Sequence, residues 1–339
     1  MLFHFIILCI FAIINNPNLT TYGQTQQTHL HIACHCPLQL DNSMRKPLLE
    51  DEEEYKETEA PKGDMVRITF RNFKTNQKSF SQTQDNSSER EALQSRASEA
   101  TPITELCKRI NFALFDYETG EKIKTLNQTT DDESFGKITM NLTKGKYAVL
   151  VVAHNGDGNA TLSNPEKVTF KDNKITDTFY YYKVIDVEED SNFDMTKKRV
   201  VAKFRLVVKD PTPEDVKTMK FYYTGGSSTF NALTGYGCVN SKQTELRSVK
   251  ESAYTEESYY DIYTFPHDPE ESKKLKMDIS ALSSASSSSA LFSKTISNVD
   301  ISQNKFICYK GYFFSADPDN SHEFTLSTTD EWQYEENEY

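Results

Sequence analysis

The chain has 339 residues, of which 37% are hydrophobic, and it carries a formal net charge of -12. This length allows two domains with tails, and the apolar fraction is too low for a membrane-embedded helical bundle. An acidic surface repels phosphate, so nucleic acid and anionic lipid headgroups are not expected as partners.

The chain begins with a short apolar run. Residues 2–14 are almost entirely apolar, but a membrane-spanning helix needs about 20 such residues. A run of this length is typical of the central part of a secretory signal. We therefore expect residues 1–33 to be a signal or leader segment and the protein to be exported.

The first cysteine after this leader, Cys34, allows three interpretations. Ile32-Ala33-Cys34 is similar to a lipoprotein box, in which small residues precede a cysteine that becomes acylated. The same stretch is also compatible with a plain polar tail. A third reading takes His29, His31, Cys34, His35 and Cys36 as soft ligands for zinc or copper, although no apolar sequence flanks them to close a site. We predict lipidation of Cys34 and no metal site.

Two polar segments lie on either side of the first predicted strand. Residues 34–63 include an unbroken acidic run from Glu50 to Glu54, which is typical of a solvated linker. Residues 74–101 are rich in Ser, Gln, Asn and Glu and predict a long polar excursion. Between them, residues 65–71 alternate apolar and polar side chains, the pattern of a half-buried strand.

Short strand-like runs then follow one another to the end of the chain. Residues 147–153 are continuously apolar and predict a central strand that is buried on both faces. The other predicted strands are 110–115, 137–142, 168–170, 178–184, 200–208, 220–223, 261–265, 305–309, 311–314 and 323–326. Many short strands without helical periodicity predict an all-β protein with two tandem β-sandwiches, at 64–192 and 193–339.

The motifs that could carry chemistry are weak. Asn155, Asp157 and Asn159 alternate as in a calcium loop, but Ala160 stands where the loop needs glycine. The glycine-rich stretch 225–229 has neither the lysine of a phosphate-binding loop nor the G-x-S-x-G spacing of a hydrolase. Turns between strands account for both.

No arrangement of titratable residues predicts catalysis. The histidines at 154, 267 and 322 are scattered and have no visible carboxylate partner in the sequence. Cys107, Cys238 and Cys308 each lie in or beside an apolar run, where a free buried thiol or a disulfide bridge is compatible with the sequence. We predict no enzyme, with no catalytic, cofactor-binding or metal-binding residue.

Several stretches of the chain also carry a family resemblance. They are residues 106–116, 142–147, 198–204 and 224–230, together with Cys34 followed by Cys36-Pro37-Leu38. In this order they resemble the minor fimbrial anchor subunits found with the fimbrillins of Bacteroidetes type V pili, over most of residues 65–339.

The resemblance implies two transthyretin-like β-sandwich domains, a lipid anchor on Cys34 in the outer membrane of a Gram-negative bacterium, and a role as the base or an accessory subunit of a pilus. The implied partners are fimbrial shaft subunits or other minor pilins.

The expected mode of partnership is strand addition, in which an unpaired sheet edge accepts a strand of a neighbouring subunit. On the sequence alone, residues 147–153 are the expected floor of the accepting groove. Two other functions remain open. An adhesive or carbohydrate-binding module would need an exposed aromatic platform, and the only tryptophan is Trp332. A surface hydrolase would need a deep polar cleft with a strongly perturbed carboxyl or imidazole.

Overall fold

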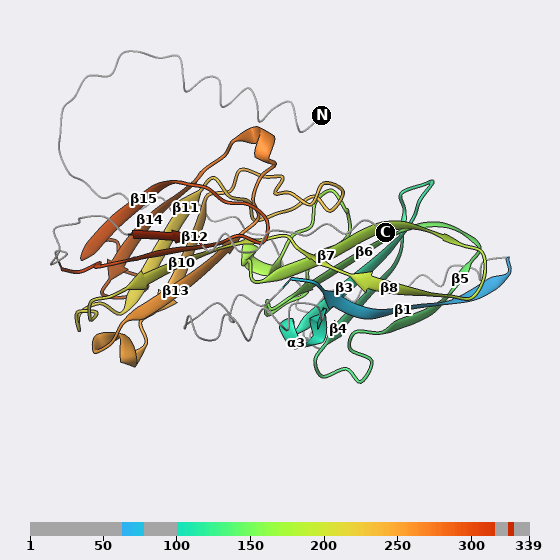
Figure 1. The fold of residues 1–339 in the computed structure, drawn as a ribbon, viewed down its shortest axis with the longest axis horizontal. Helices are drawn as coiled ribbons and strands as arrows, with labels where there is room; N and C mark the ends of the chain where they lie inside the picture. Colours follow the sequence, from blue (N-terminus) through green and yellow to red (C-terminus); the bar gives the residue numbers. More distant parts are fainter. Residues whose placement is uncertain (1–62, 78–99, 316–324, 329–339) are drawn as a thin grey trace, which may run out of the picture. The chain divides into compact units, whose positions relative to one another are not determined.

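The architecture is built almost entirely from β-strands, which confirms the all-β prediction (Figure 1). The computed structural model describes residues 63–77, 100–315 and 325–328, the last of these as backbone only. In these residues the strands form four sheets. The leader, Cys34, nearly all of the acidic linker and positions 78–99 of the polar excursion lie outside the described residues.

The N-terminal half contains two facing sheets. In the first, β1 pairs with β5 and β2 in antiparallel fashion and with β8 in parallel. The second has the order β4-β3-β6-β7-β9. The bounds are β1 Met65–Thr75, β2 Thr101–Pro102, β3 Arg109–Asp116, β4 Lys122–Thr129, β5 Ile138–Thr143, β6 Gly145–His154, β7 Thr178–Val187, β8 Ser191–Thr196 and β9 Lys198–Arg199, with a short helix α3 at Ile103–Leu106 and a 3-10 turn η2 at Lys171–Asn173.

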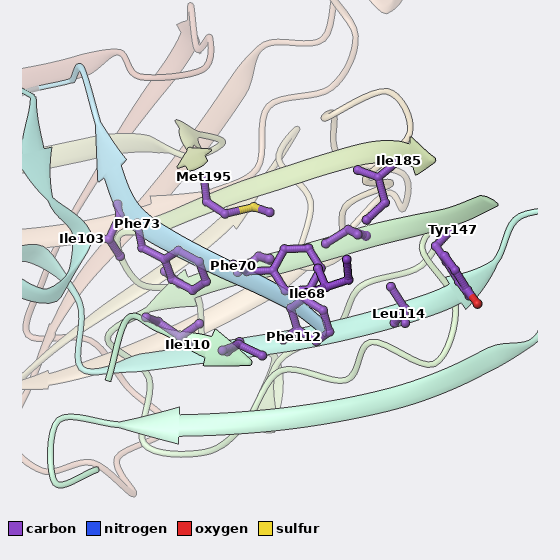
Figure 2. Close-up of a cluster of buried hydrophobic side chains, with 14 of the residues drawn as sticks. Ile68, Phe70, Phe73, Ile103, Ile110, Phe112, Leu114, Tyr147, Ile185 and Met195 are labelled. Carbon is purple, nitrogen blue, oxygen red and sulfur yellow. The ribbon is translucent and has the colours of Figure 1, made fainter. Parts of the chain in front are cut away.

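The core of this sandwich lies between β1 on one side and β3 and β6 on the other. Ile68 and Phe70 of β1 and Phe112 of β3 are fully buried there, as Figure 2 shows. The rings of Phe70 and Phe112 lie 5.0 Å apart. Alternate residues of β1 face this core, as the alternation in the sequence predicts.

The C-terminal half contains another pair of sheets, with the orders β13-β10-β16-β17 and β12-β11-β14-β15. Phe204, Phe221 and Ile279 are buried between them. The bounds are β10 Ala202–Val208, β11 Thr218–Thr224, β12 Gln243–Ser248, β13 Ser258–Thr264, β14 Leu275–Leu282, β15 Phe292–Val299, β16 Phe306–Gly311 and β17 Thr325–Thr328, with 3-10 turns η3 at Glu251–Tyr254 and η4 at Pro269–Glu271.

A further apolar cluster covers the second face of the β3–β6 sheet. Leu150 and Val152 of β6 pack there with Phe170, and with Phe230 and Phe265 from the C-terminal half. Backbone hydrogen bonds between Val168 and Phe230, at 2.9 and 3.1 Å, hold the two segments together. This second covering layer explains why β6 is apolar on both faces.

Two sequence-based boundaries can be compared with the strands. The expected domain boundary at 192/193 falls inside β8, which pairs with β1, and β9 still pairs with β7. The strand expected at 311–314 is wrong beyond Gly311, where β16 ends. The backbone N–H groups of Phe313, Phe314 and Ser315 donate instead to the carboxylate of Asp210, at 2.7–2.8 Å.

Loss of the Asp210 carboxylate is expected to loosen this segment. Asn offers one acceptor oxygen in place of two, so Asp210→Asn leaves at least one of these three N–H groups without its acceptor and should cost about 1–2 kcal/mol of unfolding free energy. Hydrogen exchange of the amides of residues 313–315 should accelerate more than that of the β10 amides. Equal protection of these amides in both proteins would show that the Asp210 carboxylate does not hold residues 313–315 in place.

Candidate functional site

The strand expected to form the floor of an accepting groove is not at an edge. β6 pairs along its length with β3 on one side and with β7 on the other. Its residues from Tyr147 to His154 are buried, four of them in one apolar cluster and three in another. The groove-floor prediction is therefore wrong, because a strand with both edges paired and both faces covered can accept no further strand.

An accepting position does exist at one side of the same sandwich, between β4 and β5. β4 pairs only with β3, and β5 pairs only with β1, so in the described residues each strand has an outer edge without a partner strand. A hollow of about 470 Å³ lies between these edges. Its walls are Leu126, Asn127 and Gln128 of β4, Lys137, Ile138 and Thr139 at the start of β5, and Asp132 and Ser134 of the connecting loop. We call this hollow and its two strand edges the β4–β5 seam.

One end of the β4–β5 seam is closed by the side chain of Gln128. Its Nε2 donates to the carbonyl oxygens of Ser134 and Lys137, at 3.0 and 2.9 Å. Its Oε1 accepts from the backbone N–H of Gly136, at 3.1 Å. The loop that joins β4 to β5 is thus held against the end of β4, and the two strands beyond it have fixed positions.

Leu126 and Ile138 are the apolar residues that line the hollow, and other apolar side chains of the two strands are only partly covered. Leu126 lies opposite Phe112 on the core-facing side of β4, and Met140 lies opposite Ile68 on β5. Both are only partly buried against the core. Ile123, near the start of β4, is 46% exposed. The seam therefore offers backbone hydrogen-bonding groups together with incompletely covered apolar side chains, the two features that an added strand uses.

A buried polar network lies on the opposite face of β3 and fixes the loop after β6. Asn111 Oδ1 accepts from His154 Nε2 at 2.9 Å and from the backbone N–H of Ala160 at 3.0 Å. His154 Nδ1 accepts from the backbone N–H of Gly156 at 3.0 Å, so the imidazole is neutral. Burial, together with the nearby Arg109 charge, lowers the pKa of His154 from 6.5 to about 4.

The oxygens of the calcium-like loop are occupied within this network. Arg109 donates to the carbonyl oxygens of Gly156 and Asp157 and, at 3.4 Å, to Oδ1 of Asn159. Asn155 Oδ1 accepts from the backbone N–H of Lys108. The guanidinium thus supplies the positive charge that the sequence pattern suggested for a metal. The described part of the chain contains no cluster of His, Cys, Asp and Glu arranged to hold a metal ion.

The glycine-rich stretch 225–229 and the three described cysteines have structural roles in the fold. Ser227 of the glycine-rich stretch is fully buried and donates to the carbonyl oxygen of Thr229 at 2.5 Å. Cys107, Cys238 and Cys308 are not joined to one another by a disulfide. Among the described residues, no helix is long and apolar enough to cross a membrane. The predicted lipidation site, Cys34, and Trp332 lie outside the described residues.

The amino-acid sequence did not predict the β4–β5 seam. β4 was not predicted as a strand, because its polar side chains gave only weak alternation. That Ile123 is exposed on an edge strand depends on the order of the strands in the sheet, which the sequence did not predict.

Comparison with known proteins decides the family. The sequence profile of the fimbrillin-A associated anchor proteins Mfa1 and Mfa2 matches residues 59–291. The chain belongs to this family. A search of curated proteins gives no match. The family consists of fimbrial anchor proteins, which confirms the resemblance described above and identifies the chain as a fimbrial accessory subunit.

Solved structures with a similar arrangement include members of fimbrial systems. The fimbrial anchor protein Mfa2 from Porphyromonas gingivalis is 10% identical, with 78% of this chain and 98% of that chain covered and a TM-score of 0.42. The tip fimbrial protein Mfa3 from the same organism is 9% identical, with 78% and 99% covered and a TM-score of 0.36. A candidate adhesin from Bacteroides thetaiotaomicron is 9% identical, with 80% and 98% covered and a TM-score of 0.44.

Proposed function

We propose that this fimbrial accessory subunit joins a pilin by accepting one of its strands at the β4–β5 seam, and that a lipid on Cys34 holds it at the outer membrane. The observation that carries the docking proposal is that, in the part of the chain that the structure describes, the outer edges of β4 and β5 have no partner strand and lie around one hollow. A strand placed there adds to β4 or to β5 by backbone hydrogen bonds, and its alternate side chains cover Leu126 and Met140.

We further propose that the protein turns over no substrate. The groups whose pKa values are most strongly shifted, among them Cys107, His154 and Lys197, have burial as the largest cause. All three side chains are at most 3% exposed. None of them lines the β4–β5 seam, so they have no access to a substrate there.

Cysteine crosslinking tests the docking proposal directly. Thr125→Cys on β4 and Thr139→Cys on β5 both place a thiol at an exposed position of the seam. In a Cys238→Ser background, each is expected to form disulfides with a series of single cysteines in the terminal strand of a co-expressed pilin. A strand bound in one register should give strong crosslinks only at every second pilin position.

The control for this experiment is Ser297→Cys, an exposed position on β15, which is the edge of another sheet. It should give no register-specific crosslink. If the protein enters fimbriae but the seam cysteines never crosslink, or crosslink no better than Ser297→Cys, docking at the seam is wrong. If deletion of the protein leaves pilus length and attachment unchanged, the anchor role itself is wrong.

The membrane attachment has its own test. Cys34→Ala is expected to move the protein from the membrane fraction to the soluble fraction, because the acyl chains would be lost. Cys36→Ala, two residues further along, is the matched control and should leave fractionation unchanged. Mass spectrometry of the mature N-terminus should find the acyl groups on Cys34. An unacylated N-terminus in the wild-type protein would refute the lipid anchor.

A further inference from the structure

A second hollow lies along the edge of β12, away from the β4–β5 seam. Its volume is about 520 Å³. The walls come from the edge of the C-terminal sandwich and from the loop around η2 in the N-terminal half. The lining residues are Asp172, Asn173, Lys174, Ser228, and every residue from Ser241 to Arg247.

The lining includes consecutive residues of β12, and this shows where the hollow lies on that strand. Successive side chains of a strand point to opposite faces, so a hollow on one face would be lined only by alternate residues. All of residues 241–247 line this one, so it follows the outer edge of β12. β12 pairs only with β11, and its outer backbone N–H and carbonyl groups therefore face the hollow without a partner strand in the described residues.

The side chains around the hollow are mostly neutral hydrogen-bonding groups. Asn173, Ser228, Ser241, Gln243 and Thr244 can each donate and accept. Ser228 and Ser241 bond to each other, with their hydroxyl oxygens 3.0 Å apart. Thr244 is exposed on the strand edge. A ligand with several hydroxyl groups matches such a lining, because each hydroxyl also both donates and accepts.

Gln243 has one hydrogen bond left to make. The residue is 7% exposed, and its Nε2 donates to the carbonyl oxygen of Asn173 at 3.1 Å. Its Oε1 is buried and has no hydrogen-bond partner. An unsatisfied buried acceptor costs about 1–3 kcal/mol, so a ligand hydroxyl that reached this oxygen after a small rotation of the carboxamide would be favoured.

The charges around the hollow compensate one another. The carboxylate of Glu245 pairs with Arg247, and Lys174 pairs with Asp157 at 3.8 Å. Asp172 and Lys242, both exposed, bring one charge of each sign. When Asp157, the partner of Lys174 outside the lining, is counted, the positive and negative charges around the hollow are equal in number, which favours an uncharged ligand.

The loop opposite β12 has an unusual backbone. Asp172 and Asn173 are adjacent and both have positive φ, at 55° and 54°. Asn and Asp tolerate this left-handed region better than most residues, and such conformations cluster at ligand-binding positions. The conformation directs the carbonyl oxygen of Asn173 to Gln243 and so closes one side of the hollow.

We propose that the hollow along β12 binds one or two neutral hexose units of a glycan. The sugar hydroxyls would bond to the β12 backbone edge, to Gln243 and to the serine pair, and Leu246, which is 43% exposed, would contact the C–H face of a ring. This site would give the accessory subunit a carbohydrate contact that is independent of strand docking at the β4–β5 seam.

Calorimetry with the full chain tests the proposal. The probes are glucose, galactose, mannose, N-acetylglucosamine and their β-linked disaccharides, with glucuronic acid as the charged comparison. At least one neutral sugar is expected to bind with a Kd below about 10 mM and more tightly than glucuronic acid. No binding by any neutral sugar at that concentration, or stronger binding of glucuronic acid, would overturn the proposal.

Two variants test whether the sugar binds at the hollow along β12. Thr244→Trp should fill the hollow and weaken the best sugar at least about tenfold, and Gln243→Leu should weaken it by about fivefold or more. Ser297→Trp, on the β15 edge of the same sheet, is the control and should change Kd by less than about twofold. Thermal unfolding of each variant shows that it is folded. Unchanged affinity in a folded Thr244→Trp protein would exclude this site.

Discussion

Replacing Phe230 with alanine is expected to lower the free energy of unfolding by about 3–5 kcal/mol, because a fully buried ring leaves a cavity that its neighbours fill only in part. The Phe230 side chain has no exposed surface. Its ring centroid lies 4.9 Å from that of Phe265 and 5.6 Å from that of Tyr180. Few other side chains contact as many aromatic rings in the described residues.

The effect should extend to both sandwiches. Phe230 belongs to the segment between β11 and β12, yet it packs on the second face of the β3–β6 sheet. Chemical denaturation, followed by tyrosine fluorescence and by circular dichroism, should show one transition in the wild-type protein and an earlier or divided one in Phe230→Ala.

The matched control is Leu233→Ala in the same loop. Leu233 is 49% exposed, so its truncation should change the unfolding free energy by less than about 0.5 kcal/mol. If Phe230→Ala is as mild as this control, the cluster shared by the two sandwiches does not contribute to stability in the way described above.

Acidification is expected to destabilise the protein through His154. The pKa of His154 is about 4 in the folded protein, against an ordinary value of 6.5. Above pH 6.5 the imidazole is neutral in both states and the full stability is present. Between these two values the unfolded chain binds a proton that the folded protein excludes, so stability falls as the pH falls. The total loss is about 3 kcal/mol, and it ends below the folded pKa.

The structural reason is that both imidazole nitrogens are engaged. Nε2 donates to Asn111, and Nδ1 accepts from the N–H of Gly156. A proton on Nδ1 would point at that N–H group, beside the Arg109 charge.

His154→Gln removes the titration and keeps a side chain that can hydrogen-bond. Unfolding free energies of both proteins at pH 7.5, 6, 5 and 4 should differ less at the acidic end, because only the wild-type protein loses the histidine contribution. Carboxyl groups titrate in both proteins, so their effect cancels in the difference. Parallel pH curves would show that His154 is not held neutral.

Membership in a fimbrial anchor family and the geometry of the edges bear on different parts of the function. Membership in the family shows that the chain is a fimbrial accessory subunit. The seam and the β12 hollow are positions where a partner strand and a sugar would act, and each has a separate test. Loss of sugar binding in Thr244→Trp with normal incorporation into fimbriae would separate the two sites.

The sequence by itself determined the type of structure and its central strands. Strand periodicity is a local property of the chain, so the alternation of residues 65–71 and the apolar run at 147–153 were sufficient to predict β1 and β6. β14 carries an equally clear alternation of Leu275, Met277, Ile279 and Ala281, although the predicted strands did not include it. That the protein is not an enzyme stays a prediction from the sequence.

Only the tertiary structure decided which edges are open and which polar groups meet. The core position of β6 depends on pairing with β3 and β7, and its second covering layer comes from Phe230, far along the chain. His154 meets Asn111 across 43 positions, and Asp210 meets Phe313 across 103. Such contacts leave no local pattern, because strand order is set by the combined burial of all the strands and a residue's own neighbours in sequence do not fix it.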